Sequence, residues 1–471
     1  MAVTTKPRWV LAICCFSLLI VGMDATIVNI ALPAIQEEFD ASVSQLQWCI
    51  AAYTVALASL LILGGSTADR LGRVRIFKTG LTLFTLASLA SAFAPSIGWL
   101  IAFRVVQGVG ASMLNPVAMS IIRNTFEDPR ERAQAIGIWG AVFGASMALG
   151  PVVGGLLVPL SWRAVFLVNI PIGIAAFVLT SRFIPESRAL RARRIDPVGQ
   201  LLAVVFLATL TAAIIEGPSL GWTSKTIALL ACAATASLIA FIGFELRRRE
   251  PLVELRFFQS RPFASATGIA VIAFAAFGGF LFVNTLYLQE VRGLSPVDAG
   301  LCTLPMAAMT VIVSPLSGRV TGRRGVRLPF VFGGVGVFIG SLMLVTLAPD
   351  TPLVWLLLAY SVFGAGFGAL NPPITNTAVS GMPADQAGVA AAVASTSRIA
   401  GQTLGVAIFG AVATAGIDDS LAAQLADSSH AAWWLIAASA LVITALGMFA
   451  STASARSSAA DVAARLQGAQ A

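Results

Sequence analysis

One acidic residue, Asp24, lies inside an otherwise apolar stretch, in the sequence GMDATIVNIALP at positions 22–33. A charged side chain at the centre of a membrane helix costs roughly 2.5–3.5 kcal/mol on insertion scales, so such residues usually face a cavity or a partner. A carboxylate in that setting can take up and release a proton, or bind a cation. Its position therefore raises the question of which residue it faces.

Arg104 is the first candidate partner, because it lies at a comparable depth in another apolar segment. At 1.5 Å of rise per helical residue, Asp24 is about 14 Å below Pro33 and Arg104 about 9 Å below Gly98. We expect the two side chains to face one cavity and to pair, directly or through water. A static pair that only fixes two helices is the alternative to a role in proton or substrate coupling.

The composition identifies the elements that carry these residues. Of the 471 residues, 57% are hydrophobic and 11% are charged, with a mean hydropathy of +0.87, whereas a soluble domain carries roughly 25% charged residues. The apolar blocks are continuous and about 20 residues long, which is enough to cross a hydrocarbon core of ~30 Å as helices. An all-α polytopic membrane protein is predicted, with its first block retained as a helix rather than cleaved as a signal.

Fourteen transmembrane helices are predicted from these blocks. Their ranges are 9–33, 45–67, 76–96, 98–122, 135–157, 162–184, 197–217, 225–246, 264–289, 298–318, 327–348, 353–375, 388–413 and 432–452.

The net charge of +8 reflects orientation and predicts no nucleic-acid partner. With the N-terminus inside, most basic residues fall in one alternating set of loops, and only Arg163, Lys225 and Arg292 fall in the opposite set. The positive-inside rule then places both termini in the cytoplasm.

Several functions are excluded by absence. There is no Gly-Lys dipeptide, and hence no Walker A loop for ATP. The single histidine, His430, is expected in the last external loop, and the five cysteines form no C-x-x-C pair. We therefore expect no metal and no cofactor, and any energy source must be an ion gradient.

An internal repeat divides the chain. GVGASMLNP (108–116) and GAGFGALNP (364–372) share G-x-G-x-x-x-L-N-P, and GGSTADRLGR (64–73) has a weaker counterpart in SGRVTGRRGV (317–326). Parallel repeats of this kind build one large group of secondary transporters, with substrate at the repeat interface. The predicted domains are a six-helix bundle (1–184), two inserted helices with their flanking loops (185–261), a second six-helix bundle (262–452) and a short cytoplasmic tail (453–471).

Four motifs give the chain a family resemblance. It resembles the major facilitator superfamily, and within it the fourteen-helix drug:proton antiporters that export quaternary ammonium compounds and other drugs. The motifs are a loop motif (Gly65, Asp69, Arg70, Gly72, Arg73), a helix 4 motif (Arg104, Gln107, Gly108, Gly110), an antiporter motif (Gly150, Pro151, Gly154, Gly155) and a helix 1 signature (Asp24, Thr26, Ile27, Val28, Asn29, Ala31, Leu32, Pro33).

The sequence also departs from the family pattern. Ser146 stands where the antiporter motif usually has another glycine, and Gly322 replaces the aspartate in the second copy of the loop motif. The segment 298–318 has no acid beyond Asp298 at its mouth, which argues against dicationic substrates.

The resemblance implies a proton-coupled exporter that works by alternating access, with Asp24 as the proton site and Arg104 as its modulator. The loop motif would act as a cytoplasmic gate, in which Asp69 caps a neighbouring helix N-terminus, where negative charge is favoured; an ordinary charged loop is the alternative. The antiporter motif would bend at Pro151 and block a leak, or simply allow close helix packing.

Three further residues are candidates for coupling or substrate contact. Arg398 lies near mid-membrane, where it either takes part in coupling or extends into a cytoplasmic cavity. Glu216 is a solvated residue at an external helix end or a vestibule contact for cations. Asn284 lies beside several phenylalanines that are candidates to line an apolar cavity.

The predicted function is export of lipophilic neutral or monocationic compounds across a bacterial cytoplasmic membrane, by a monomer that is not an enzyme. A dedicated exporter of a self-made metabolite or antibiotic, or of a lipid-like amphiphile, is the alternative. A non-transporting membrane sensor is the alternative from another class; it would predict a long soluble appendage or a decayed set of motifs.

Overall fold

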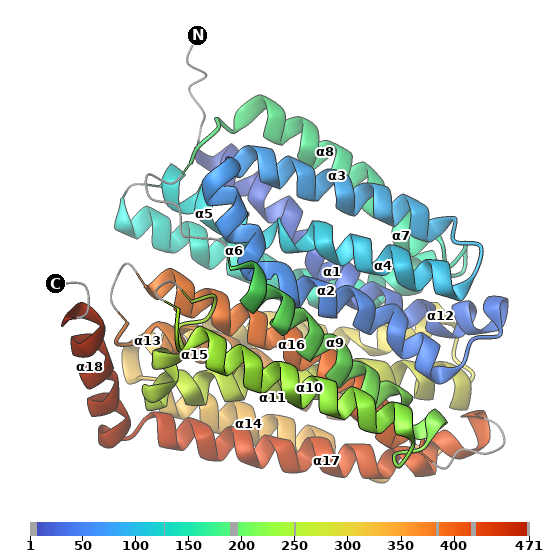
Figure 1. The fold of residues 1–471 in the computed structure, drawn as a ribbon. Helices are drawn as coiled ribbons and strands as arrows, with labels where there is room; N and C mark the ends of the chain where they lie inside the picture. Colours follow the sequence, from blue (N-terminus) through green and yellow to red (C-terminus); the bar gives the residue numbers. More distant parts are fainter. Residues whose placement is uncertain are drawn as a thin grey trace. The chain divides into compact units, whose positions relative to one another are not determined.

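A computed structural model describes residues 7–126, 128–188, 196–248, 251–382, 386–415 and 421–468. Within these ranges every regular element is a helix, as the composition predicts (Figure 1). The basic residues Lys6, Arg191, Arg193, Arg194 and Arg249, which contribute to the predicted orientation, lie outside the described residues.

The chain divides into two compact units. The first extends to Val204 and includes Ser295–Leu301. Its helices are α1 (Pro7–Phe39), α2 (Val43–Leu71), α3 (Arg73–Ala92), α4 (Ile97–Ser112), α5 (Asn115–Thr125), α6 (Pro129–Leu157), α7 (Ala164–Leu167), α8 (Asn169–Phe183), the first part of α9 (Pro197–Leu220) and most of α12 (Pro296–Cys302).

The second unit comprises Val205–Leu294 and the chain from Cys302 onward. Its helices, after the rest of α9, are α10 (Lys225–Glu245), the 3₁₀ helix η1 (Leu255–Gln259), α11 (Arg261–Leu286), the π-helical turn η2 (Tyr287–Val291), α13 (Leu304–Arg324), α14 (Arg327–Leu342), α15 (Leu353–Val379), α16 (Ala387–Ala413), α17 (Leu421–Ala450) and α18 (Ala453–Gly468).

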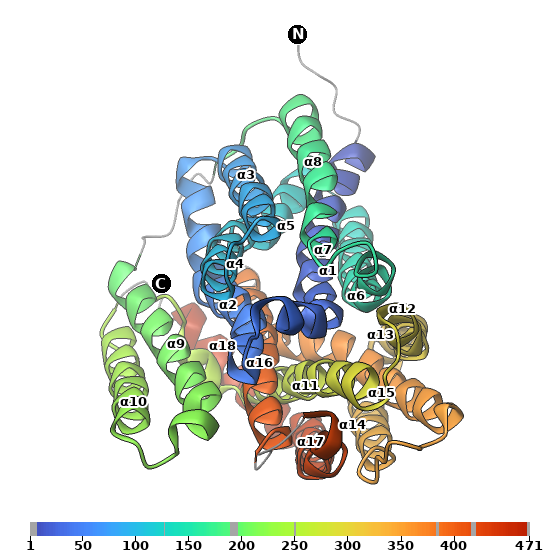
Figure 2. The ribbon, with the colours of Figure 1, turned by 90° about the vertical axis from the view of Figure 1, so that its right-hand side faces the viewer.

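The two units repeat the same helix neighbours. In the first, α4 packs between α2 and α3, and α1 packs on α6; in the second, α15 packs between α13 and α14, and α11 packs on α16 (Figure 2). Of the two repeated nine-residue segments, 108–116 begins in α4 and 364–372 lies within α15. These are the central helices of the two arrangements. The internal repeat therefore has a structural counterpart.

Glycines of the repeat explain why these neighbours pack so closely. A Cβ atom at Gly108 would lie within 3.0 Å of the Tyr53 backbone in α2, and one at Gly364 within 3.0 Å of the Met306 backbone in α13. Small residues at such crossings let helix backbones approach closely, and dispersion contacts then replace the hydrophobic driving force that lipid does not supply.

A helix lies at each of the fourteen predicted segments, but the count of fourteen membrane spans is not confirmed. Ten helices in the described part are long and apolar enough to cross a membrane. Among the remaining segments, α3 begins with Arg73, Arg75 and Lys78, and the apolar parts of α6 and α14 are shorter. The polytopic membrane character of the chain follows from the ten spans alone.

Several segments predicted as single helices are interrupted before prolines. The segment 98–122 breaks between α4 and α5 just before Pro116, 162–184 breaks before Pro171, and 298–318 breaks before Pro305. Proline lacks an N–H and its ring clashes with the carbonyl four residues earlier, which favours a break at these points.

The end of the chain departs from prediction in two places. Helix α17 begins at Leu421, well before the predicted residue 432, so His430 lies in a helix rather than in a loop, with its Nε2 2.8 Å from the Leu347 carbonyl oxygen. The tail from 453 forms α18, which was not anticipated. Its apolar side chains are mostly alanines, so its hydrophobic periodicity is weak in the sequence.

The glycine crossings can be tested by adding a single methyl group. Gly364→Ala places a Cβ against the Met306 backbone, and overpacking of this kind costs about 1–3 kcal/mol. We expect a lower apparent melting midpoint of the purified protein in detergent, measured by the loss of monodisperse protein on heating.

Gly243→Ala in α10 is the matched control, since a Cβ there meets nothing within 4 Å. Alanine is the better helix former by about 1 kcal/mol, so the midpoint should stay or rise. Equal behaviour of the two variants would contradict the packing argument.

Candidate functional site

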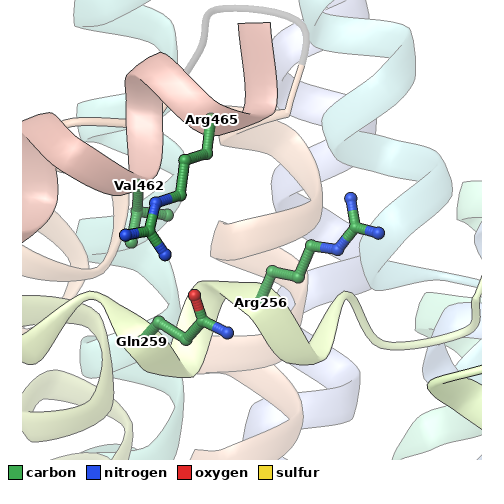
Figure 3. A pocket seen from close by; sticks show the side chains of 4 residues that line it. All are labelled: Arg256, Gln259, Val462 and Arg465. Atoms are coloured by element: carbon green, nitrogen blue, oxygen red, sulfur yellow. The ribbon is translucent and has the colours of Figure 1, made fainter. Parts of the chain in front are cut away.

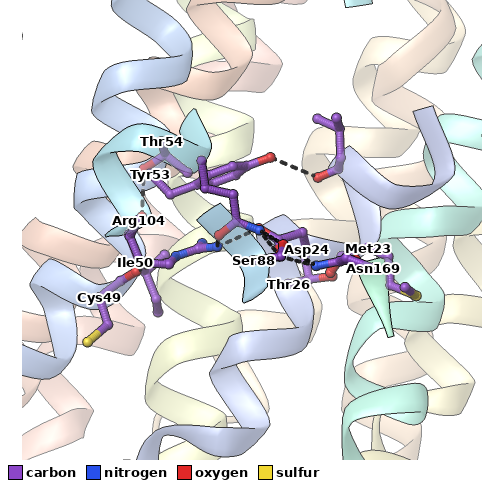
Figure 4. A network of polar contacts seen from close by, with 12 residues as sticks. Met23, Asp24, Thr26, Cys49, Ile50, Tyr53, Thr54, Ser88, Arg104 and Asn169 are labelled. Atoms are coloured by element: carbon purple, nitrogen blue, oxygen red, sulfur yellow. Dashed lines mark hydrogen bonds and ion pairs between the residues drawn. The ribbon is translucent and has the colours of Figure 1, made fainter. Parts of the chain in front are cut away.

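A buried polar cluster in the first unit is centred on Asp24 of α1 (Figure 4). Asp24 Oδ2 accepts a hydrogen bond from an Arg104 Nη at 2.5 Å, and both residues are 0% exposed. Asp24 Oδ1 accepts from Gln107 Nε2 and from Asn169 Nδ2, each at 2.8 Å. The predicted pairing of Asp24 with Arg104 is confirmed as a direct ion pair.

Arg104 is held from several sides. Its Nε donates to the Cys49 carbonyl oxygen at 3.0 Å, and the same Nη that binds Asp24 also donates to Gln107 Oε1 at 2.7 Å. Its guanidinium carbon lies 4.2 Å from the centre of the Tyr53 ring, and a desolvated cation–π contact contributes roughly 2 kcal/mol. Gln107 reaches both members of the pair because it follows Arg104 by three residues, on the same helix face.

Ser88 and Asn169 complete the cluster from α3 and α8, and the sequence analysis missed both. Ser88 Oγ accepts from Gln107 Nε2 at 2.7 Å and from Asn169 Nδ2 at 3.2 Å. Asn169 begins α8, at the break two residues before Pro171. The break before Pro171 was the only local signal for Asn169. A polar residue that seems to lie in the middle of a helix stands out only when the helix is known to begin at that residue.

The Asp24 carboxylate is surrounded by hydrogen-bond donors. Its two oxygens accept three hydrogen bonds from a guanidinium and two amides, and such charge-assisted bonds are roughly twice as strong as neutral ones. Arg104 Nη2 and Asn169 Oδ1 are buried without a hydrogen-bond partner. The cluster therefore keeps one free donor and one free acceptor beside the carboxylate.

The antiporter motif packs directly against this part of α1. A Cβ at Gly150 would collide with Thr26 Oγ1, and one at Gly154 would lie 2.9 Å from the Ile27 carbonyl oxygen. Thr26 Oγ1 also donates to the Met147 carbonyl oxygen at 2.9 Å. Within the same unit, a Cβ at Gly155 would lie 2.6 Å from the Pro296 carbonyl oxygen of α12.

These distances show close packing of α6 on the helix that carries Asp24. Pro151 lies inside a continuous α6. The role of the motif in blocking a leak stays a prediction.

The loop motif forms a compact turn between α2 and α3. Asp69 Oδ1 accepts from Arg73 Nε at 3.1 Å and from an Arg73 Nη at 2.9 Å, while Arg70 is exposed at the end of α2. A Cβ at Gly65 would contact the Pro116 ring at 3.3 Å. In this structure Asp69 is thus paired with an arginine of its own motif, and its role in a gate stays a prediction.

Glu186, rather than Asp69, binds the N-terminus of α3. Its carboxylate oxygens accept from the backbone N–H groups of Val74 and Arg75, each at 3.0 Å, and Arg73 N donates to the Ser187 carbonyl oxygen at 2.9 Å. A helix N-terminus leaves N–H donors unsatisfied and favours negative charge, so this is a strong position for a carboxylate. Sequence analysis passed over Glu186 because it lies far along the chain from the loop motif.

Gly72 makes room for that contact. It has φ +116, a conformation that residues with a side chain rarely adopt, and a Cβ there would lie 2.7 Å from the Glu186 carboxyl carbon. The glycine of the loop motif is therefore required by both the turn and the carboxylate that caps α3.

The other three candidates, Arg398, Asn284 and Glu216, lie in the second unit, and each has different hydrogen-bond partners. An Arg398 Nη donates to Thr375 Oγ1 at 2.5 Å and to the Asn371 carbonyl oxygen at 3.3 Å. Asn284 Oδ1 accepts from the Tyr360 hydroxyl at 2.6 Å. Glu216, half-buried in α9, accepts from Ser219 Oγ at 3.2 Å.

Ten apolar spans in the described residues, and the same helix neighbours in both units, define a polytopic membrane protein with an internal repeat. The family model of the Major Facilitator Superfamily matches residues 14–406, and the chain belongs to that family. Its members are membrane transporters of small molecules rather than enzymes.

Curated relatives cover most of the chain. It is 38% identical over 410 residues to the multidrug resistance protein Stp of Mycobacterium tuberculosis (87% of this chain, 76% of the relative). It is 36% identical to the tetracenomycin C resistance and export protein of Streptomyces glaucescens (85% and 75%). It is 37% identical to the puromycin resistance protein of Streptomyces alboniger (89% and 84%).

Solved structures share the fold at low identity. A bacterial homologue of the human lysosomal transporter Spinster superposes with a TM-score of 0.69 at 18% identity, covering 97% of this chain and 98% of that one. A D-xylose–proton symporter gives a TM-score of 0.65 at 16% identity, covering 93% and 97%.

The cap on α3 gives a test of the loop geometry. Glu186→Ala removes the acceptor for the Val74 and Arg75 amides, and loss of such a cap costs about 1 kcal/mol. We expect faster hydrogen–deuterium exchange, by about fivefold, in a peptide that covers the first turn of α3, measured by mass spectrometry. Glu131→Ala, an exposed acid in the first turn of α6, is the control and should leave that peptide unchanged; unchanged exchange in both would refute the cap.

Proposed function

We propose that this protein is a proton-coupled antiporter that exports lipophilic neutral or monocationic compounds by alternating access. The observation that carries the proposal is the buried carboxylate of Asp24, held by Arg104 and two amide donors inside a membrane helix. Because such a group is expensive to bury, a working role explains its presence better than a structural one.

The chemistry of the pair supplies the coupling step. In the ionised form, Asp24 binds Arg104. Protonation neutralises the carboxylate and leaves a buried arginine without its counter-charge, a situation that costs several kcal/mol. The helices that carry the pair then favour another arrangement, and a cationic substrate competes for the ionised form. Proton and substrate therefore exclude each other at one carboxylate.

The contacts of the pair limit how the helices can move. Asp24 and Arg104 belong to α1 and α4, and the antiporter glycines hold α6 against α1 close to Asp24. A change in charge at Asp24 therefore acts on tightly packed backbones rather than on loose side chains. We propose that the loop motif serves as the cytoplasmic gate and the antiporter motif as the seal.

The names of the relatives support the class of cargo. They are a multidrug resistance protein, a drug efflux pump and several antibiotic resistance proteins.

The acids of the chain bear on the charge of the cargo. In the helix pair α12–α13, the one acid is Asp298, which accepts from Ser295 Oγ at 2.7 Å near the start of α12. Neutral or singly charged cargo fits a site with one carboxylate already balanced by an arginine.

A dedicated exporter of a self-made metabolite or antibiotic is the second candidate. Relatives named for resistance to tetracenomycin C, methylenomycin A and puromycin favour it. The coupling site would be the same, and only the cargo would differ. Export of a lipid-like amphiphile stays open on the same grounds.

The cellular setting follows from the same proposal. The chain would reside as a monomer in a bacterial cytoplasmic membrane, with both termini in the cytoplasm as the distribution of its basic residues predicts. Its partners would be protons, the small-molecule substrate and the lipid bilayer, without a cofactor.

Dye and proton movement should be measured together. In energised inverted vesicles that contain the protein, ethidium addition should release protons from the acidic lumen, so lumenal pH rises as dye accumulates. Asp24→Asn keeps the shape of the side chain but removes its exchangeable charge, and both signals should fall at least tenfold.

Glu37→Gln is the matched control, because it makes the same chemical change at an exposed position of the same helix. It should transport like the parent. Full coupling in Asp24→Asn would refute the assignment and move attention to Arg398 and Glu216. A parent that moves no dye would favour the dedicated-exporter candidate.

The amide donors should matter as well. Asn169→Ala removes one of the two bonds to Asp24 Oδ1, and a hydrogen bond to a charged group contributes about 1.5–3 kcal/mol. We expect proton-coupled dye transport to slow by about tenfold or more, in the same vesicle assay. Thr180→Val, a buried polar position on the same helix, should stay within twofold of the parent; equal losses in both would indicate a general packing defect instead.

A further inference from the structure

A basic pocket lies between the C-terminal helix α18 and the 3₁₀ helix η1, both in the second unit (Figure 3). Its volume is about 240 Å³, and it is lined by Arg256 and Gln259 of η1 and by Val462 and Arg465 of α18. Two arginines and an amide thus line one hollow, and the described lining holds no carboxylate. None of these residues belongs to the coupling site.

Helix α18 is fixed in place by its own contacts. Ala455, Ala459 and Val462 recur at helical spacing and are buried, and Val462 packs into a cluster with Phe257 and Phe263. On the adjoining face, Ser458 Oγ accepts from the Arg261 backbone N–H at 3.1 Å, and Ser454 Oγ accepts from the Arg261 guanidinium. The position of the helix is therefore determined by both apolar and polar contacts.

That docking places Arg465 at the pocket. It follows Val462 by three residues, so it lies on the same side of the helix. In Figure 3 it extends from α18 toward Gln259, whereas the Arg256 side chain leaves η1 in the opposite direction, away from Arg465. The Arg256 side chain is 61% exposed, and the Glu254 carboxylate lies 3.8 Å from its Nε. Arg256 is thus accessible and only weakly neutralised.

The chemistry of the lining selects its ligand. Guanidinium groups bind phosphate with paired N–H donors, and two of them beside one hollow repel each other unless an anion lies between them. The Gln259 amide offers a further donor. A phosphate-bearing anion can accept from Arg465 and Gln259 and draw in the exposed Arg256 side chain, whereas an apolar or cationic ligand would use none of these donors.

The surroundings favour a lipid as the source of that phosphate. Gln259 lies two residues before α11, whose membrane span begins at Arg261, and α18 follows directly after α17, whose span ends at Ala450. Phe258, beside the pocket in sequence, is 40% exposed, and the Arg261 guanidinium lies 5.8 Å from the Phe449 ring. Exposed aromatic and basic residues at span ends are typical of the headgroup region.

We propose that this pocket binds a phosphate-bearing anion, the headgroup of an anionic phospholipid. The ligand links α18 and η1, and so holds the end of the chain against the start of α11. The inference does not depend on the transported substrate.

Native mass spectrometry of the full-length protein provides the first test. Protein released from detergent with phosphatidylglycerol or phosphatidylcholine should retain phosphatidylglycerol preferentially. Arg256→Gln and Arg465→Gln should each weaken retention about fivefold or more, since each arginine near an anionic lipid contributes about that factor. Because both bind one phosphate, the double variant should lose less than the product of the single losses.

Arg456→Gln is the matched control, an exposed arginine on the same helix that does not line the pocket. It should retain phosphatidylglycerol within twofold of the parent. Arg465→Lys keeps the charge but not the paired donors, and should retain an intermediate amount. Each variant is first checked for a single symmetric peak in size exclusion.

A second measurement distinguishes the lipid from a free anion. Thermal unfolding in neutral detergent is compared in sodium phosphate and in sodium chloride at equal ionic strength. Stabilisation by phosphate that needs Arg256 and Arg465, without selective lipid retention, would support the anion site with a soluble ligand. If neither lipid retention nor phosphate stabilisation depends on these two arginines more than on Arg456, the proposal is wrong.

Discussion

The ion pair between Asp24 and Arg104 is the constraint on which the first unit depends. Two charges buried in a membrane helix bundle are tolerated when they pair with each other and when hydrogen bonds occupy most of their remaining donors and acceptors. Gln107, Ser88 and Asn169 supply those bonds from α4, α3 and α8. One carboxylate therefore fixes the polar residues of three other helices, and any change in its charge reaches all of them at once. A group with such connections is suited to converting protonation into helix movement.

Close backbone approach is the second requirement, and glycine meets it in both units. The Gly108 crossing on Tyr53 and the Gly364 crossing on Met306 bring equivalent helices together in each half. At Gly150 the same device lies beside the charge pair, where a methyl group would collide with Thr26. Rigid crossings of this kind cannot deform gradually, so an alternating mechanism has to move packed helices as bodies.

The sequence predicted the helical segments, the repeat and the Asp24–Arg104 pair, because apolar block length and depth in the membrane are local properties. It did not predict Asn169 or Ser88, whose relation to Asp24 depends on which helices pack together. Glu186 was missed for the same reason: its partners, the amides of Val74 and Arg75, lie on another element far along the chain. Helix α18 was not predicted because its many alanines give little difference in hydrophobicity between one helix face and the other. Its position is set by tertiary contacts with Arg261 and Phe257.

The two halves kept a common scaffold but diverged in chemistry. In the second unit, the helix equivalent to α1 carries Phe274, Phe277 and Phe280, whose rings pack on Phe367 and Phe363 of α15. Asn284 in the same helix is already bound by Tyr360, and Arg398 lies beside the Phe274 ring. Stacked rings are favourable for burial and carry no exchangeable proton. The equivalent helices of the two units thus differ: α1 carries the buried carboxylate of Asp24, whereas α11 carries packed aromatic rings.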